Sequence, residues 1–476
     1  MIVAASAACA SDPGHVAIVE PMAPAPSASA SSGAEKKRDV SPGADGAEGD
    51  GESPASSAVD ASDAARPSAA ALAAIEPVRP HLPNDISFLV ITIDTLRPDL
   101  GCLGYGRPVS PNIDKLAERA VVYERAYSIS TYTGFCLTPM MASRYPTEMP
   151  RNDRHEVKYF KENVLLAERL RAAGYHTAGA ASHFLFAPEL GWIDGFERFV
   201  HAPVEGNARP GSGVDAFHSS RIMANTAIRL LSDPQITSGP FFIWVHFLDP
   251  HKKYLEHPGF DFGDDPRGLY DGEVAFTDFH VGRVLDTLAA SPLRERTVVI
   301  ITADHAEAFG EHGFYFHGRE EWEEVVRIPF LVLAPGNVPR HIARRMSVVE
   351  FAPTVLELAG LPADPGARGQ SLVPELYGGE LPERPILIDQ PKNPYYPLRR
   401  SFIDGGYKLI TTPSMDSNLL FDLNKDPGET KDLADVEPDA FRHTREAYEA
   451  FMSEVPEFTP RPFGAPPPKT GQGKAH

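Results

Sequence analysis

Acidic and histidine side chains come close after three short apolar runs of this sequence. They are Asp94 after the run ending at Ile93, Asp249-Pro-His251 after the run ending at Phe247, and Asp304-His305 after the run ending at Thr302. Carboxylates and an imidazole brought together offer the oxygen and nitrogen ligands that divalent cations bind. A single Asp after a strand is more typical of a turn or a helix cap, so the hypothesis of a site depends on the combination.

The apolar runs and the segments between them predict the elements that would position these side chains. Residues 88–93, 241–247 and 297–302 are brief and rich in β-branched or aromatic residues, which is typical of buried strands. Helical spacing of apolar residues marks 113–120, 164–173, 272–289 and 351–359. Strands that alternate with helices predict an α/β fold with a central, mostly parallel sheet flanked by helices. Ligands of such sheets bind beyond the carboxyl ends of the strands, where the polar residues stand.

The pattern changes near residue 385. Short strands are predicted at 400–403, 407–410 and 419–423, followed by a helix at about 434–455. We therefore expect a catalytic domain over residues 84–385 and a small C-terminal α+β subdomain, an antiparallel sheet with a helix, over 386–460.

The two ends of the chain have a different composition. Residues 1–83 are dominated by Ser, Ala, Gly, Pro and charged residues, which predicts a disordered tether, and residues 461–476 predict a disordered tail. Small residues lead into Cys9, as at the end of a bacterial lipoprotein signal, although a basic region and a full apolar stretch are missing. This pattern predicts an exported, periplasmic or cell-surface lipoprotein anchored through Cys9. An Ala-rich terminus that is no signal would instead leave the protein in the cytoplasm.

Composition excludes several classes of protein. The 476 residues include 45 Lys and Arg against 65 Asp and Glu, a net charge of −20, and no basic stripe stands out, so we expect no nucleic-acid partner. No apolar run reaches 18 residues, so no transmembrane helix is predicted. The three cysteines, Cys9, Cys102 and Cys136, are too few for a disulfide framework.

Several motifs in a fixed order resemble one family. They are FLVITIDTLRPDLGCLGYGRPVSP at 88–111, YERAY at 123–127, RYP at 144–146, ADHAEAFGEHG at 303–313, HG at 317–318, RIP at 327–329, APTV at 352–355 and FDLNKDPGE at 421–429. The sequence thereby resembles the sulfatase branch of the alkaline phosphatase superfamily over about residues 84–455. The resemblance implies the alkaline phosphatase-like α/β sandwich, ester hydrolysis and a metal-bound nucleophile at a helix N-terminus.

The nucleophile position departs from the sulfatase pattern. The family makes formylglycine from a Cys or Ser twelve residues before the Tyr of its Gly-x-Tyr-Pro element, and counting back from Tyr145 reaches Thr133. Thr133-Gly-Phe-Cys-Leu137 lacks the modifiable residue, the Pro and the Arg of that signal, and Cys136 is three positions late. Formylglycine is therefore not expected. A threonine resembles the phosphate-transferring relatives, in which a metal-activated hydroxyl attacks phosphorus.

The resemblance assigns roles to the remaining site residues. Asp94, Thr133, Asp304 and His305 would bind one divalent ion, with Ca, Mg, Mn and Zn left open. His251 and His317 would bind the free oxygens of the ester group or protonate the leaving group, while His183 and Asp249 are candidates for substrate binding. His312 is interpreted as structural. An Asp-x-x-x-His pair for a second ion is not found in Asp249-x-His251, which favours one metal.

Three functions remain open at this point. The first is a metal-dependent hydrolase or transferase of phosphate, phosphonate or sulfate esters with Thr133 as the nucleophile. The second is a sulfuric ester hydrolase, similar to an arylsulfatase, that works without formylglycine. The third is a surface binding protein with a degenerate site. The substrate is expected to be a small-molecule ester, because an acidic protein attracts anionic polymers poorly.

Overall fold

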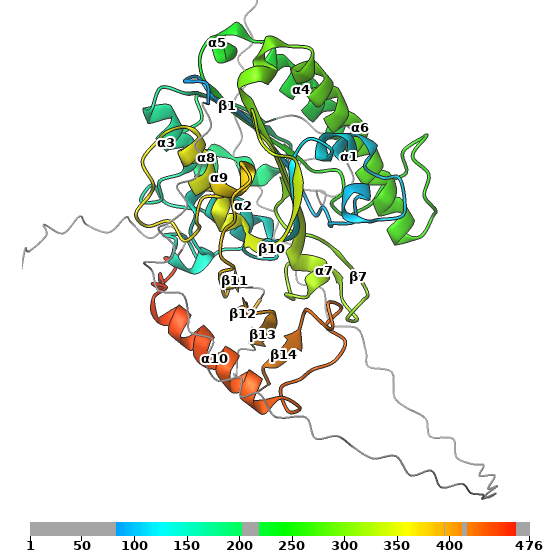
Figure 1. Ribbon diagram of the computed structural model, residues 1–476, viewed down its shortest axis with the longest axis vertical. Helices are drawn as coiled ribbons and strands as arrows, with labels where there is room; N and C mark the ends of the chain where they lie inside the picture. Colours follow the sequence, from blue (N-terminus) through cyan, green and yellow to red (C-terminus); the bar gives the residue numbers. More distant parts are fainter. Residues whose placement is uncertain (1–81, 202–218, 395, 412–416, 463–476) are drawn as a thin grey trace, which may run out of the picture. The chain divides into compact units, whose positions relative to one another are not determined.

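The central sheet has eight strands in the order β10-β2-β9-β6-β1-β5-β3-β4 (Figure 1). The computed structural model describes residues 82–201, 219–394, 396–411 and 417–462. Its strands are β1 Ser87–Ile93, β2 Val121–Tyr127, β3 His176–Ala181, β4 Arg198–His201, β5 Phe241–Phe247, β6 Thr297–Ala303, β9 Arg327–Leu333 and β10 Arg340–Ser347. Every pairing is parallel except those of β9 with β6 and with β2. The predicted, mostly parallel α/β sheet is confirmed.

Helices cover both faces of this sheet. In Figure 1, α1, α4 and α6 lie on one side of it, and α2, α3, α8 and α9 lie on the other. The helices are α1 Pro111–Ala117, α2 Thr133–Ala142, α3 Leu166–Ala172, α4 Ser220–Leu231, α5 Pro234–Thr237, α6 Pro266–Ala289, α7 Glu323–Val326, α8 Phe351–Leu358 and α9 Val373–Leu376. Because both faces are covered, β1, β5 and β6 are buried along their whole length.

A second, antiparallel sheet follows in the order β11-β12-β13-β14, with α10 packed on it. Its elements are β11 Ile386–Gln390, β12 Arg399–Asp404, β13 Tyr407–Thr411, β14 Leu419–Asp422 and α10 Pro438–Ser453. A two-stranded hairpin, β7 Ala308–Phe309 with β8 Tyr315–Phe316, lies outside both sheets. The predicted antiparallel sheet and helix at the C-terminal end are present.

Most element boundaries differ from the prediction by one to four residues, and α6 differs most. It begins at Pro266, where the sequence pattern placed the start at residue 272, because Asp265 accepts hydrogen bonds from the amides of Arg267 and Gly268. This Asp-Pro start is a capping signal that apolar spacing alone does not detect. The predicted tether, with Cys9, lies outside the described residues up to residue 81, and the predicted tail lies outside them from residue 463 onward.

Within the described ranges, no helix combines the length and apolar composition needed to cross a bilayer. All of these ranges belong to one compact unit, residues 73–476.

Candidate active site

The carboxyl ends of β1 and β6 bring Asp94 and Asp304 together. Asp94 follows β1, and its amide donates a hydrogen bond of 2.9 Å to the carbonyl of Phe247 on β5. Asp304 follows β6, and its Oδ1 accepts from the amides of Thr95 at 3.3 Å and of His305 at 2.9 Å. Thr95 adopts a φ of 54°, which β-branched residues rarely do. This turn aims the Thr95 amide at Asp304, so the two strand ends are joined at the site.

Thr133 lies next to Asp304 and His305, at the start of α2. It is the first residue of α2, and its Oγ1 lies 3.2 Å from His305 Nε2. The other ring nitrogen of His305, Nδ1, donates to the carbonyl of Ala306 at 3.1 Å, since a carbonyl oxygen can only accept. In the neutral ring Nε2 therefore carries the lone pair, which can either accept a hydrogen bond from Thr133 Oγ1 or bind a cation.

The chemistry of this group fits a divalent cation. Asp94, Asp304 and His305 are buried, and their ligand atoms lie within 4.8 Å of one another. Among the described residues, Asp94 Oδ1, Thr95 Oγ1 and Asp304 Oδ2 are buried without a hydrogen-bond partner. Buried carboxylate oxygens without donors are expensive, and a hard cation with oxygen ligands satisfies them.

Electrostatics around Asp94 keep it ionised. Burial opposes its charge, but a hydrogen bond from His246 and the nearby imidazoles hold the pKa of Asp94 well below its usual range. His305 shows the complementary shift. Burial opposes a charged ring, yet Asp304 and Asp94 raise its pKa above the ordinary value. The site is therefore a negatively charged centre surrounded by imidazole rings.

Four imidazoles form a row that leads outward from the carboxylates. The ring centres of His305 and His317 are 4.4 Å apart, those of His317 and His251 are 5.0 Å apart, and those of His251 and His183 are 6.5 Å apart. His305 is fully buried, whereas the other three are partly exposed.

Two of the outer imidazoles are held in the uncharged form. Burial and the neighbouring rings lower the pKa of His317 well below its usual range and that of His183 to about 3. His317 Nδ1 shares a hydrogen bond of 3.0 Å with Glu307, so Nε2 is the ring nitrogen that can meet a ligand. His251 Nδ1 donates to the carbonyl of Lys252 at 2.9 Å, which orients that ring through its Nδ1 as well.

Asp249 is the one predicted site residue that the structure directs elsewhere. Its Oδ1 accepts from the amide and hydroxyl of Ser219, and its Oδ2 accepts from the amide of Ser220 at 2.8 Å. Both carboxylate oxygens are thus used to fix the start of α4. The expected substrate contact is replaced by a structural one, since a capped helix N-terminus favours a carboxylate.

His312 is held in a structural network, as its sequence context suggested. Its ring stacks on Trp322 with centres 4.0 Å apart, and Nδ1 lies 2.8 Å from a Glu324 oxygen.

Sequence reasoning missed three residues of the site, namely Thr95, His246 and Glu307. His246 Nε2 lies 3.3 Å from Asp94 Oδ2, and its Nδ1 lies 2.9 Å from Thr92 Oγ1. The signal for His246 was an ionisable residue within an apolar strand. Glu307 follows Asp304 by three residues but could be linked to His317 only through the folded hairpin.

Comparisons with known proteins show the family of the chain. The model of the sulfatase family, described as "Sulfatase", matches residues 87–361, more than half of the chain. The model described as "N-sulphoglucosamine sulphohydrolase, C-terminal" matches residues 310–442.

Individual relatives are distant but extend over most of the chain. Choline-sulfatase of Rhizobium meliloti is 23% identical over 427 residues, covering 73% of this chain and 82% of its own. Human arylsulfatase A is 26% identical over 421 residues, covering 72% and 82%. The solved structure of a phosphonate monoester hydrolase of Agrobacterium radiobacter shares the fold, with a TM-score of 0.62, 19% identity and coverage of 78% and 96%. The chain belongs to the sulfatase family, a family of ester hydrolases in the alkaline phosphatase superfamily.

Proposed function

We propose that this protein is a metal-dependent hydrolase or transferase of phosphate, phosphonate or sulfate esters, with Thr133 as its nucleophile. The observation that carries the proposal is the 3.2 Å contact of Thr133 Oγ1 with His305 Nε2, beside the unpartnered oxygens of Asp94 and Asp304. A hydroxyl at the first residue of a helix, beside residues that would hold a cation, is placed to lose its proton to solvent, because the helix N-terminus and a bound cation both stabilise the alkoxide.

Asp94, Thr133, Asp304 and His305 would bind one divalent cation. When bound, that ion would lower the pKa of the threonine hydroxyl and offset the negative charge of the ester group. The four ligands do not distinguish Ca, Mg, Mn and Zn.

The chain's own residues then account for the proton transfers. Thr133 Oγ1 attacks the phosphorus or sulfur, and the bond to the ester oxygen breaks. His317 or His251 hydrogen-bonds the departing oxygen. In the neutral His317 ring, Nε2 gives its proton to that oxygen while Nδ1 takes up the proton of Glu307, whose pKa burial raises to about 7. Water, or a second alcohol, then gives its proton to His317 Nε2 as its oxygen attacks the phosphorus or sulfur, and the bond to Thr133 Oγ1 breaks.

Phosphorus esters suit a threonine better than sulfate esters do. Formylglycine in its hydrated form carries two hydroxyls on one carbon. After one of them has taken up the sulfate, the other can expel it by breaking the carbon–oxygen bond. Threonine has no such group, so release requires a second attack at the phosphorus or sulfur. A sulfuric ester hydrolase remains the second candidate, because choline-sulfatase and arylsulfatase A are among the relatives and the family model is that of sulfatases. A binding protein without turnover is the third.

A hairpin of aromatic residues suggests the nature of the alcohol part of the ester. Phe314, Tyr315 and Phe316 precede His317 and are 37%, 61% and 41% exposed. Lys252, next to His251, lies over the Phe316 ring at 4.6 Å, so the hairpin borders the histidine row. We infer that an aromatic or other apolar alcohol group stacks on these rings.

The test is turnover of nitrophenyl esters of a phosphate diester, a phosphonate monoester and sulfate by the full chain. We expect Thr133→Ala to lower kcat by at least about 10³-fold, as loss of a nucleophile does, and Thr133→Ser to keep activity. Thr138→Ala, in the same helix, is the matched control.

Metal binding is followed separately by the melting temperature with and without a chelator. We expect the ion to stabilise the protein and Asp304→Asn to abolish that effect. Turnover of sulfate alone would favour the second candidate. Turnover that survives Thr133→Ala would contradict the assignment of Thr133 as the nucleophile. Absence of both turnover and stabilisation by the metal ion would favour a binding protein.

A further inference from the structure

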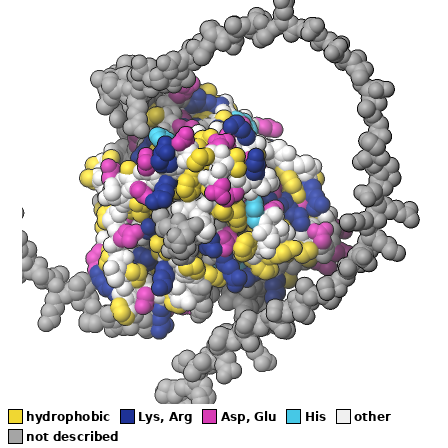
Figure 2. Space-filling view, turned by 90° about the horizontal axis from the view of Figure 1, so that it is seen from below, with side chains coloured by type: hydrophobic (Ala, Val, Ile, Leu, Met, Phe, Trp, Pro, Cys, Tyr) yellow, Lys and Arg dark blue, Asp and Glu magenta, His cyan; other side chains and the backbone are white. Residues whose placement is uncertain are grey.

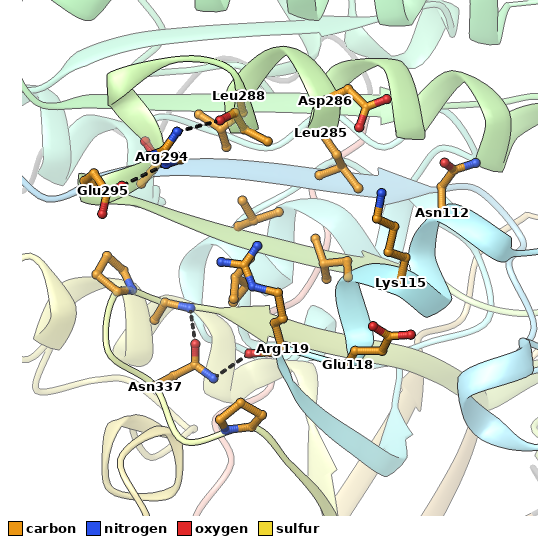
Figure 3. Close-up of a pocket in the computed structure, with 18 of the residues that line it drawn as sticks. Asn112, Lys115, Glu118, Arg119, Leu285, Asp286, Leu288, Arg294, Glu295 and Asn337 are labelled. Carbon is orange, nitrogen blue, oxygen red and sulfur yellow. Dashed lines mark hydrogen bonds and ion pairs between the residues drawn. The ribbon is translucent and has the colours of Figure 1, made fainter.

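A cavity of about 530 Å³ lies between α1, α6 and the central sheet (Figure 3). This volume is typical of pockets for small organic ligands, which span about 300–1,000 Å³. Its inner wall is apolar and consists of Leu116, Leu285, Leu288, Val299 and Leu333. Figure 3 shows Leu285 and Leu288 facing it from α6.

This cavity is separate from the candidate active site. Thr297, which lines it, is the first residue of β6, whereas Asp304 follows the last one. A strand advances about 3.3 Å per residue, so the two places lie about 20 Å apart along β6. Leu333 ends the antiparallel strand β9 and therefore reaches the same edge as Thr297. Neither Thr133 nor any histidine of the row lines the cavity.

Two cationic side chains enter this cavity without a partner. Among the described residues, neither Lys115 nor Arg119 has an ion pair or a side-chain hydrogen bond, and both are exposed. Figure 3 shows the Arg119 guanidinium in the middle of the cavity and the Lys115 side chain pointing from α1 toward α6, near Leu285, with the carboxylates of Glu118 and Asp286 at the edge. Arg294, by contrast, is paired with Glu295 at 2.8 Å.

Among the described residues, Lys115 and Arg119 have no ion pair although the protein is acidic. The chain carries a net charge of −20, so carboxylates that could pair with them are plentiful. The loop under Arg119 is also fixed, because Asn337 donates to the Arg119 carbonyl at 3.0 Å and accepts from the Ala334 amide at 3.1 Å. A fixed apolar wall beside an unpaired guanidinium and ammonium group complements one anionic head on an apolar body.

We propose that this cavity binds a free amphipathic monoanion, with its aliphatic or aromatic body on the leucines and its carboxylate, sulfonate or sulfate on the Arg119 guanidinium, while Lys115 adds positive charge on the α1 side. Arg119 offers the planar fork that such head groups accept in a bidentate manner.

The test is calorimetric titration of the full chain with decanoate, decyltrimethylammonium and decanol, which share one tail and differ in head group. We expect only decanoate to bind at this cavity. The double variant Lys115→Gln with Arg119→Gln keeps two methylenes of each stem but removes both charges, and we expect it to weaken decanoate binding by about tenfold or more, because charge-assisted hydrogen bonds are lost. Lys431→Gln, at another exposed lysine, is the matched control.

A decanoate analogue with a photoreactive tail locates the site independently of affinity. We expect it to label residues 282–289 or 333–339, and Leu285→Asp to prevent labelling. Equal binding of the three amphiphiles, full affinity of the double variant, or labelling only next to His317 would each overturn the proposal.

Discussion

At the scale of single residues, the histidine row is the feature with the clearest consequence. Glu307 is buried, and its 3.0 Å contact with His317 Nδ1 fixes the ring so that Nε2 is the nitrogen left for the substrate. A hydrogen bond of this kind sets the tautomer of an imidazole. Glu307 is therefore a positioning residue for His317.

We expect Glu307→Gln to lower kcat more for esters with poor leaving groups. A phenyl ester needs proton donation to its departing oxygen, whereas a 4-nitrophenyl ester needs little. The fall should be about 10²-fold for the phenyl ester and within about tenfold for the 4-nitrophenyl ester, in line with general acid catalysis. Steady-state rates on the pair of esters check this, and an equal fall on both would assign Glu307 to structure alone.

The residues that sequence motifs could predict are those that stand directly after strands. Asp94, Asp304 and His305 gather because parallel strands end at one edge, and the order of the motifs along the chain is enough to indicate this. Thr133 could be placed only by its distance from Tyr145.

The remaining site residues are beyond the reach of such motifs. His246 looks like a core residue of a strand, and Thr95 acts through its backbone amide. Spacing along the chain also does not tell which way a carboxylate points. The substrate contact predicted for Asp249 therefore gives way to its hydrogen bonds at the start of α4.

At the scale of elements, Asp249 connects the end of β5 to the start of α4. Its carboxylate accepts from two backbone amides and one hydroxyl, all of them buried. Asp249→Asn places an amide group against these donors, and we expect a loss of about 3 kcal/mol in the free energy of unfolding, because buried hydrogen bonds to a charged acceptor are strong. Asp265→Asn, at the exposed cap of α6, is the control and should cost less.

Urea unfolding together with KM distinguishes the two roles of Asp249. If Asp249→Asn raises KM and leaves the free energy of unfolding unchanged, Asp249 contacts the substrate, as the sequence suggested.

The β7–β8 hairpin makes a separate prediction about specificity. Tyr315 is 61% exposed and lies two residues before His317. Burying part of its ring against an aromatic alcohol group contributes about 1 kcal/mol, so Tyr315→Ser should raise KM for a naphthyl ester by about fivefold. The KM for a methyl ester should not change. Val436→Ser, at a residue that is 60% exposed in the turn before α10, serves as the control. Equal changes for both esters would remove the hairpin from substrate recognition.

At the scale of the whole molecule, charge is distributed in two different ways. Figure 2 shows Lys and Arg interspersed with Asp and Glu over one face, without a large field of one sign. Inside the molecule, however, several glutamates are buried. Burial raises the pKa of Glu321 to about 8 and that of Glu350 to about 7, with nearby cations offsetting only part of the effect. Burial, together with the charge of Asp249, raises the pKa of Glu273 to about 10.

These raised values determine how stability changes with pH. Each glutamate keeps its proton in the folded protein up to a higher pH than in the unfolded chain, where its pKa is about 4.5. Between these two values the native state binds more protons at these glutamates, so their contribution to the free energy of unfolding falls as pH rises, against a smaller rise from His183 and His317, whose pKa values are lowered. The contribution is fully present below about pH 4.5 and is lost as pH passes the folded-state pKa.

We therefore expect the protein to be less stable at pH 8 than at pH 5, by on the order of 2 kcal/mol. Urea unfolding at both values measures the difference. Glu321→Gln carries a neutral side chain of the same size at every pH. Its free energy of unfolding should therefore equal that of the parent protein at pH 5 and be higher than that of the parent at pH 8. Glu380→Gln, at an exposed position, should leave the slope unchanged. If Glu321→Gln shows the same loss between pH 5 and 8 as the parent, Glu321 is already ionised in the folded protein, and the buried cation at Lys408 compensates its charge fully.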